Sequence, residues 1–115
     1  MLTLDLPYPP SVNHYWRMAR GHWYISAEGK RYRAAVWAEA RDRAFSIAAP
    51  LRVDVALTMP DKRRRDVDNV LKALLDALQH AGVYADDSQI EELHVVKVGL
   101  AKPGGVRVTI EETER

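Results

Sequence analysis

Hydrophobic and polar residues alternate in several segments of the chain, and this alternation predicts strands buried on one side. The clearest alternation ends at Pro60, and a shorter one near the beginning ends at Pro7. Two further segments are separated by the turn residues 102–105, and we expect them to form a hairpin. The predicted strands cover residues 2–6, 51–59, 90–100 and 105–111.

Two other segments have the composition or apolar spacing of helices. The first is expected over about 27–46, behind Ser26 as its N-cap. The second is expected over 67–81, where apolar residues recur at intervals of three and four and would share one face. Asp66 is its predicted N-cap, and Gly82 is a suitable C-terminal stop.

The order of these elements is β-α-β-α-β-β, which predicts an α+β fold. We expect a two-layer domain with a four-stranded mixed sheet, one face of it under two helices and the other facing water. Residues 7–25 are expected to be a long irregular segment, and a segment of this length in a small domain is usually functional. Its aromatic residues argue against disorder.

The composition is that of one ordinary globular domain over residues 1–115. Of the 115 residues, 47% are hydrophobic and 29% are charged, which excludes disordered and fibrous classes. The absence of cysteine excludes disulfides, thiolate zinc sites and iron–sulfur clusters. No apolar run is long enough to cross a membrane and the N-terminus has no secretion signal, so we expect a cytoplasmic protein without a membrane partner.

The net charge of +1 conceals a run of four cations at 62–65, directly followed by acidic residues. Such a run repels itself unless an anion compensates it, although a solvated loop is the commoner explanation. Asp66 and Asp68 lie where the second helix is expected to begin, and Asp87 follows that helix. Carboxylates of this kind are suitable ligands for Mg²⁺.

Each acidic residue also has a purely structural explanation. Asp66 could cap the helix, Lys72 could pair with Asp68 one turn away, and Asp87 could belong to a turn. Phosphodiester chemistry, however, needs both cations that hold the DNA backbone and carboxylates that hold a metal. Taken together, the two clusters favour this chemistry.

Three stretches of the chain resemble the RusA family of Holliday-junction resolvases. They are LPYPPSVN at 6–13, MPDKRRRDVDNVLK at 59–72 and AGVYADDSQ at 81–89. The resemblance implies a homodimeric endodeoxyribonuclease that uses Mg²⁺ or Mn²⁺ to nick four-way DNA junctions in a symmetric pair of cuts. The family's catalytic residues correspond to Asp66, Asp68, Lys72 and Asp87, of which the three aspartates would bind the metal. We expect DNA contacts from Lys62, Arg63, Arg64, Arg65, Asn13 and Arg17.

Two other functions remain open at this point. A non-catalytic DNA-binding module would use the basic run but would not need the carboxylates, which repel DNA unless a metal neutralises them. A metal-dependent nuclease with another preference, for flaps, single strands or RNA, would use the same residues.

The position of Asp87 poses a geometric problem. A helix over 67–81 is about 22 Å long, and residues 82–87 can return at most about 20 Å. Either this segment runs straight back along the helix, or the helix is shorter, or a partner chain supplies the third carboxylate.

Overall fold

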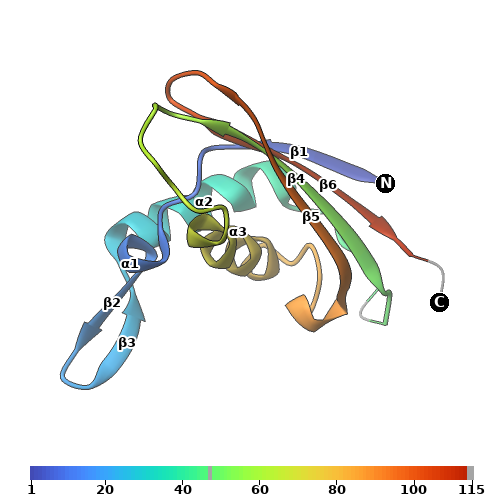
Figure 1. The fold of residues 1–115 in the computed structure, drawn as a ribbon. Coiled ribbons are helices and arrows are strands. Elements are labelled where there is room, and N and C mark those ends of the chain that lie inside the picture. The colour runs from blue at the N-terminus through green and yellow to red at the C-terminus, as the bar shows by residue number, and fades with distance from the viewer. Residues whose placement is uncertain (47, 114–115) are drawn as a thin grey trace.

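The computed structural model describes residues 1–46 and 48–113, which form a sheet with helices packed against one of its faces (Figure 1). Residues 47, 114 and 115, which the single-domain prediction includes, lie outside the described residues. The elements in chain order are β1 (Leu2–Leu6), α1 (Val12–Tyr15), β2 (Trp16–Ala19), β3 (His22–Ile25), α2 (Ala27–Ala40), β4 (Leu51–Met59), α3 (Asp68–His80), the 3₁₀-helix η1 (Asp87–Gln89), β5 (Ile90–Leu100) and β6 (Gly105–Glu112).

The main sheet has the strand order β1-β6-β4-β5. Strand β4 pairs in parallel with β5 and antiparallel with β6, so the sheet is mixed. Every second residue of β4, from Leu51 to Met59, is buried, and these side chains form the centre of the core with those of α2 and α3. The α+β prediction with a four-stranded mixed sheet is therefore confirmed.

The predicted hairpin of residues 90–100 and 105–111 is wrong. Strand β4 lies between β5 and β6 and pairs with both, so these two neighbours in sequence do not touch along their length. The turn between them does form, with Gly104 in the left-handed region at φ 83°, and it crosses the end of β4. The amide of Ala101 there donates to the carbonyl of Met59 at 3.0 Å. Which strand takes the centre of the sheet depends on how the whole sheet packs against the core. A local turn pattern does not contain this information.

Helix α2 begins as predicted and ends earlier than predicted. The Ser26 hydroxyl accepts a hydrogen bond from the amide of Gly29 at 2.9 Å, which confirms the N-cap. The helix ends at Ala40 rather than near residue 46, because Asp42 adopts φ 68° and the chain then turns towards α3. There the amide of Phe45 donates to the Val83 carbonyl at 2.9 Å, a tertiary contact that helical geometry would not allow.

Helix α3 buries the face that its apolar spacing predicts, including Val70, Leu74 and Leu78. Gly82, at φ 82°, ends it as expected. The described contacts include no capping hydrogen bond from the side chain of Asp66; the Asp66 carbonyl instead accepts from the amide of Asn69 at 3.2 Å. The prediction of Asp66 as a side-chain cap is therefore wrong. No helix in the described part of the chain is both long and apolar enough to span a membrane.

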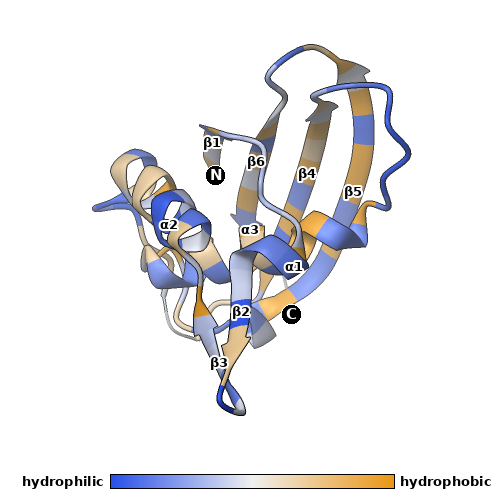
Figure 2. Cartoon of the chain, turned by 90° about the vertical axis from the view of Figure 1, so that its left-hand side faces the viewer, coloured by the Kyte–Doolittle hydropathy of each residue, from blue (hydrophilic) through white to orange (hydrophobic). Residues whose placement is uncertain are grey.

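Residues 7–25 are not irregular, contrary to the prediction. They contain the short helix α1 and a separate two-stranded sheet of β2 and β3, which projects from the body of the molecule (Figure 2). Tyr15 at the end of α1 is fully buried, and the ring of Trp16 meets it edge-on at 4.5 Å between centroids. These aromatic contacts attach the base of the hairpin to the core, which explains why the segment is ordered.

Candidate active site

Asp66 and Asp68 line one hollow at the beginning of α3. Asn69 and Lys72 line the same hollow, whose volume is about 520 Å³. Asp68 and Lys72 are one helical turn apart, so their side chains lie on the same face of α3. The structure thus brings three of the four predicted catalytic residues, Asp66, Asp68 and Lys72, to one exposed surface.

A network around Asp61 shapes the segment that leads from β4 into this hollow. The Asp61 carboxylate pairs with the guanidinium of Arg65 and accepts from the amide of Arg63 at 2.9 Å. These hydrogen bonds, above all that of Arg65, hold the pKa of Asp61 well below its usual range. The ammonium group of Lys97 on β5 donates to the Arg65 carbonyl. Together they fix the direction in which the chain enters α3, and so the position of Asp66.

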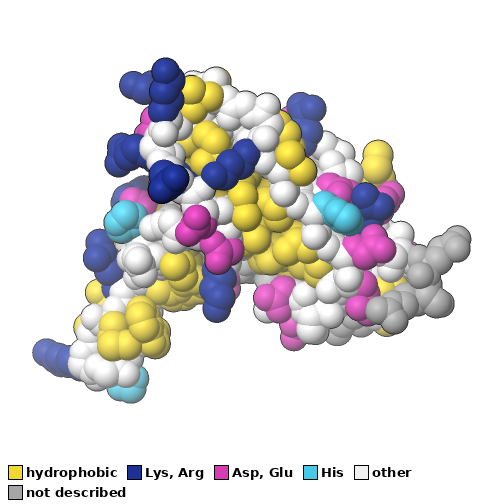
Figure 3. All heavy atoms as spheres, viewed as in Figure 1, with side chains coloured by type: hydrophobic (Ala, Val, Ile, Leu, Met, Phe, Trp, Pro, Cys, Tyr) yellow, Lys and Arg dark blue, Asp and Glu magenta, His cyan; other side chains and the backbone are white. Residues whose placement is uncertain are grey.

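The four cations of the basic run are not equivalent. Lys62, Arg63 and Arg64 are exposed, and Lys and Arg side chains gather at the end of the molecule where this segment lies (Figure 3). Arg65 is half-buried, pairs with Asp61, and lies 6.0 Å from the centroid of the Tyr8 ring. Arg65 therefore has a structural role in addition to the DNA contact that the sequence predicts for it.

Asn13 and Arg17 lie on different elements of the segment that precedes α2. Asn13 on α1 lines a second hollow together with Lys72. Arg17 is exposed on β2, where it pairs across the hairpin with Tyr24. Of the two, only Asn13 is brought next to the predicted catalytic residues.

Asp87 lies at the opposite end of α3 from Asp66 and Asp68. Its amide donates to the side-chain oxygen of Gln79 at 3.0 Å. Because Gln79 follows Asp68 by eleven residues, the two positions are about 16 Å apart along the helix. Among the described residues, no three acidic or histidine side chains are close enough together to hold a metal ion. The chain therefore does not bring Asp87 to the other two carboxylates.

Asp86, beside Asp87, has a structural function. Its carboxylate accepts from the amide of Ser88 at 2.9 Å and caps η1, which lowers the pKa of Asp86. Gln89 completes this capping box and donates to the carbonyls of Ser46 and Ala49, both at 3.0 Å. These contacts anchor η1 and engage the carboxylate of Asp86, although both Asp86 and Asp87 are exposed.

Asp76, two turns after Asp68, is also used structurally. The buried hydroxyl of Tyr15 donates to its carboxylate at 2.5 Å, and the guanidinium of Arg33 pairs with it at 2.7 Å. Burial is the largest cause of the raised pKa of Tyr15, and the bond to Asp76 adds to it. The network joins α1, α2 and α3 behind the candidate site. No spacing pattern indicated Tyr15 or Arg33, because their partner is more than forty residues away.

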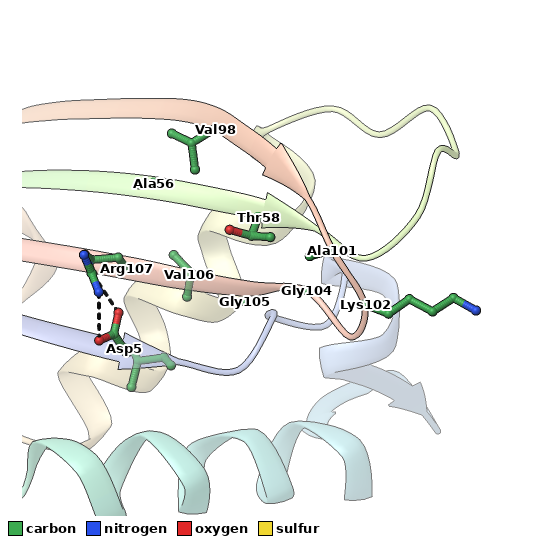
Figure 4. A pocket seen from close by; sticks show the side chains of 11 residues that line it. Asp5, Ala56, Thr58, Val98, Ala101, Lys102, Gly104, Gly105, Val106 and Arg107 are labelled. Atoms are coloured by element: carbon green, nitrogen blue, oxygen red, sulfur yellow. Dashed lines mark hydrogen bonds and ion pairs between the residues drawn. The ribbon is translucent and has the colours of Figure 1, made fainter.

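A separate hollow of about 390 Å³ lies on the sheet face opposite the helices. Its charged residues Asp5 and Arg107 pair with each other at 2.8 Å, and the Lys102 side chain points away from it (Figure 4). Because Asp5 and Arg107 neutralise each other, this hollow is less suited than the one at α3 to bind a metal ion or a phosphate.

Comparison with known proteins identifies the family. The sequence model of the family Endodeoxyribonuclease RusA matches residues 7–111. The chain is 46% identical over 111 residues to the crossover junction endodeoxyribonuclease RusA of Enterobacteria phage HK97, covering 95% of this chain and 91% of that protein. It is 43% identical over 112 residues to the protein of the same name from Shigella sonnei and 42% identical over 112 residues to that from Escherichia coli K12, each time covering 96% of this chain and 93% of the relative.

The chain belongs to the RusA family. The resemblance read from the three sequence stretches is thereby confirmed. All ten residues predicted to act in catalysis or DNA binding fall within the part of the chain that the RusA family matches. The curated relatives are named as endonucleases of DNA, so the RusA family is a family of phosphodiester-hydrolysing enzymes.

Proposed function

We propose that this protein is a divalent-metal-dependent endodeoxyribonuclease that resolves four-way DNA junctions by paired symmetric nicks in recombination and repair. The hollow that joins Asp66, Asp68 and Lys72 carries this proposal. Family membership supports it, because the relatives are named for cleavage of crossover junctions. With DNA as the substrate, we propose the cytoplasm as the place of action.

The carboxylates present are suitable for Mg²⁺ or Mn²⁺. Asp66 and Asp68 offer hard oxygen ligands on an exposed surface, and Mg²⁺ usually binds one or two carboxylates together with water and substrate phosphate. When bound, such an ion lowers the pKa of a water nucleophile and neutralises charge on the leaving oxygen. Lys72 lies where its ammonium group can bind the same phosphate and stabilise the charge that develops on it.

The exposed cations of the basic run would hold the DNA. Only Arg65 separates Lys62, Arg63 and Arg64 from Asp66 in sequence, so a duplex arm bound by them would pass the hollow. Contacts of this kind are made to phosphates and do not read sequence. They account for general DNA affinity, and selectivity for a junction must come from another feature.

A homodimer is the second part of the proposal. Two cuts on a two-fold substrate require two sites, and a C2 dimer provides them. In the described part of the chain, strand β5 lies at an edge of the main sheet and pairs with β4, and four of its apolar side chains are exposed. They are Leu93, Val96, Val98 and Leu100. Packing against β5 of a second copy of the chain would cover both these apolar side chains and the edge of the sheet.

A dimer would also explain how Asp87 can act together with Asp66 and Asp68. In one chain, Asp87 is bonded to the side chain of Gln79, whose backbone lies about 16 Å along α3 from that of Asp68. The described residues include no three acidic or histidine side chains close enough to hold one ion. We propose that each site combines Asp66 and Asp68 of one subunit with Asp87 of the partner subunit. The substitution Leu93→Glu on β5 should then yield a monomer without metal-dependent cleavage, as measured by light scattering and a nicking assay. The matched change Thr3→Glu, on the other edge strand, should leave the dimer intact.

Cleavage of a labelled four-way junction tests the activity directly. We expect paired nicks with Mg²⁺ or Mn²⁺, no cleavage of a linear duplex of the same sequence, and loss of cleavage but not of junction binding in Asp68→Asn. Junction binding without any cleavage would favour the non-catalytic binding module. Equal cleavage of flaps, single strands or RNA would favour a nuclease with another preference.

A further inference from the structure

The β2–β3 hairpin carries an apolar face that packs against the core only at its base. In its register Met18 lies opposite Trp23, and Trp16 lies opposite Ile25, so these four side chains share one face. Trp16 and Ile25, at the base, pack against the core. Trp23, farther out, is 68% exposed. A tryptophan in this position gains little for folding, since most of its surface remains in water.

This face borders a hollow beside the candidate active site. Trp16 and Trp23 line it from the hairpin, Asn13 lines it from α1, and its volume is about 280 Å³. The hollow shares Val12 and Lys72 with the one that contains Asp66 and Asp68. A ligand held there would therefore adjoin a phosphate bound at Lys72.

We propose that this hollow binds a single unstacked DNA base next to the phosphate that is cut. The inference rests on the proposed function. The indole rings of Trp16 and Trp23 offer the flat apolar surface on which any base can stack. The Asn13 amide offers both a donor and an acceptor to the edge of that base, so Asn13 is a specificity-determining residue.

Nucleic acid is the ligand that best fits these neighbours. It carries an aromatic ring system adjacent to each phosphate, which matches an apolar hollow beside a lysine and two potential metal ligands. A volume of about 280 Å³ is small among ligand sites, which suits one base rather than a base pair. Taking a base out of a continuous duplex costs stacking energy, and this cost is least where pairing is already interrupted. The hollow would therefore favour the exchange point of a junction over a linear duplex.

Junction binding in EDTA isolates this contact from catalysis. We expect Trp23→Ala to weaken binding of a four-way junction by roughly 5- to 150-fold, the range for loss of one stacked base, and to leave linear-duplex binding unchanged. Trp23→Phe should retain most of the junction affinity. Trp37→Ala is the matched control, because Trp37 is also exposed but lies on α2, away from both hollows.

An abasic nucleotide, introduced one position at a time around the exchange point, identifies the base. At one position, loss of the base should weaken junction binding by the wild type and leave junction binding by Trp23→Ala unchanged. With Asn13→Ala, the preference among bases at that position should disappear, because binding of the preferred base should fall to the level of the others.

The failures are distinguishable. If the wild type binds junction and duplex equally, the proposed function is wrong and this inference falls with it. If the wild type prefers the junction and Trp23→Ala keeps that preference, or if Trp37→Ala loses as much, only the inference is overturned.

Discussion

Combining two inactive variants in one dimer should restore cleavage if Asp87 acts across the interface. The variants are Asp68→Asn and Asp87→Asn, each of which disables both sites of its own homodimer. In a heterodimer of the two, one site receives both defects. The other combines an intact Asp68 with Asp87 of the partner subunit, and is therefore complete.

The magnitude follows from the geometry of α3. Oxygens that bind one Mg²⁺ at 2.0–2.1 Å lie within about 4 Å of each other. The amide of Asp87 is held by the side chain of Gln79, whose backbone lies about 16 Å along the helix from that of Asp68. Among the described residues, no three acidic or histidine side chains are close enough to hold one ion. The heterodimer should therefore have one functional site of two. We expect about half the wild-type nicking rate, with junctions nicked on one strand rather than resolved.

Co-expression of the two variants with different affinity tags, followed by purification on both, provides the heterodimer. Nicked and resolved products separate on native and denaturing gels. A heterodimer of Asp66→Asn with Asp68→Asn is the matched control, since both defects then affect the same half of a site and no site is complete. Failure of Asp68→Asn with Asp87→Asn to exceed this control, or failure to isolate any heterodimer, would refute the shared site.

Three further predictions concern the scaffold. Gly29→Ala places a Cβ 2.5 Å from the Tyr15 carbonyl oxygen. This overpacking costs about 1–3 kcal/mol, whereas the higher helix propensity of alanine contributes about 1 kcal/mol. The variant should therefore have a lower melting temperature than the wild type. Tyr15→Phe removes the hydrogen bond to Asp76 but leaves its ion pair with Arg33, so urea denaturation should show a loss of about 1–2 kcal/mol with no change in the metal dependence of cleavage. The lowered pKa of Asp61 means that its arginine pairing stabilises the fold above about pH 4 and is lost as the pH falls towards the folded-state pKa. Asp61→Asn should therefore be less stable than the wild type at pH 7 by urea denaturation, and a difference that did not shrink towards pH 3 would contradict this assignment.

The error at the hairpin and the error in residues 7–25 have different origins. The hairpin prediction was wrong about pairing, although both strands exist, because pairing depends on which segment takes the centre of the sheet. The segment 7–25 was expected to be irregular because no alternation marks β2 and β3, whose side chains are mostly exposed on both faces. Its order comes from Tyr15 and Trp16, and their partners in the core lie far away in sequence.

The sequence alone determined the features whose causes are local: strands β1 and β4, the Ser26 cap, the apolar face of α3, and the proximity of Asp66, Asp68 and Lys72. Neighbours within one helical turn meet wherever that helix is placed. Only the tertiary structure decided that β4 separates β5 from β6, that Asp76 binds Tyr15 and Arg33, and that Asp87 lies at the far end of α3. These arrangements depend on how segments distant in sequence pack against one core. The spacing of residues along the chain does not predict that packing.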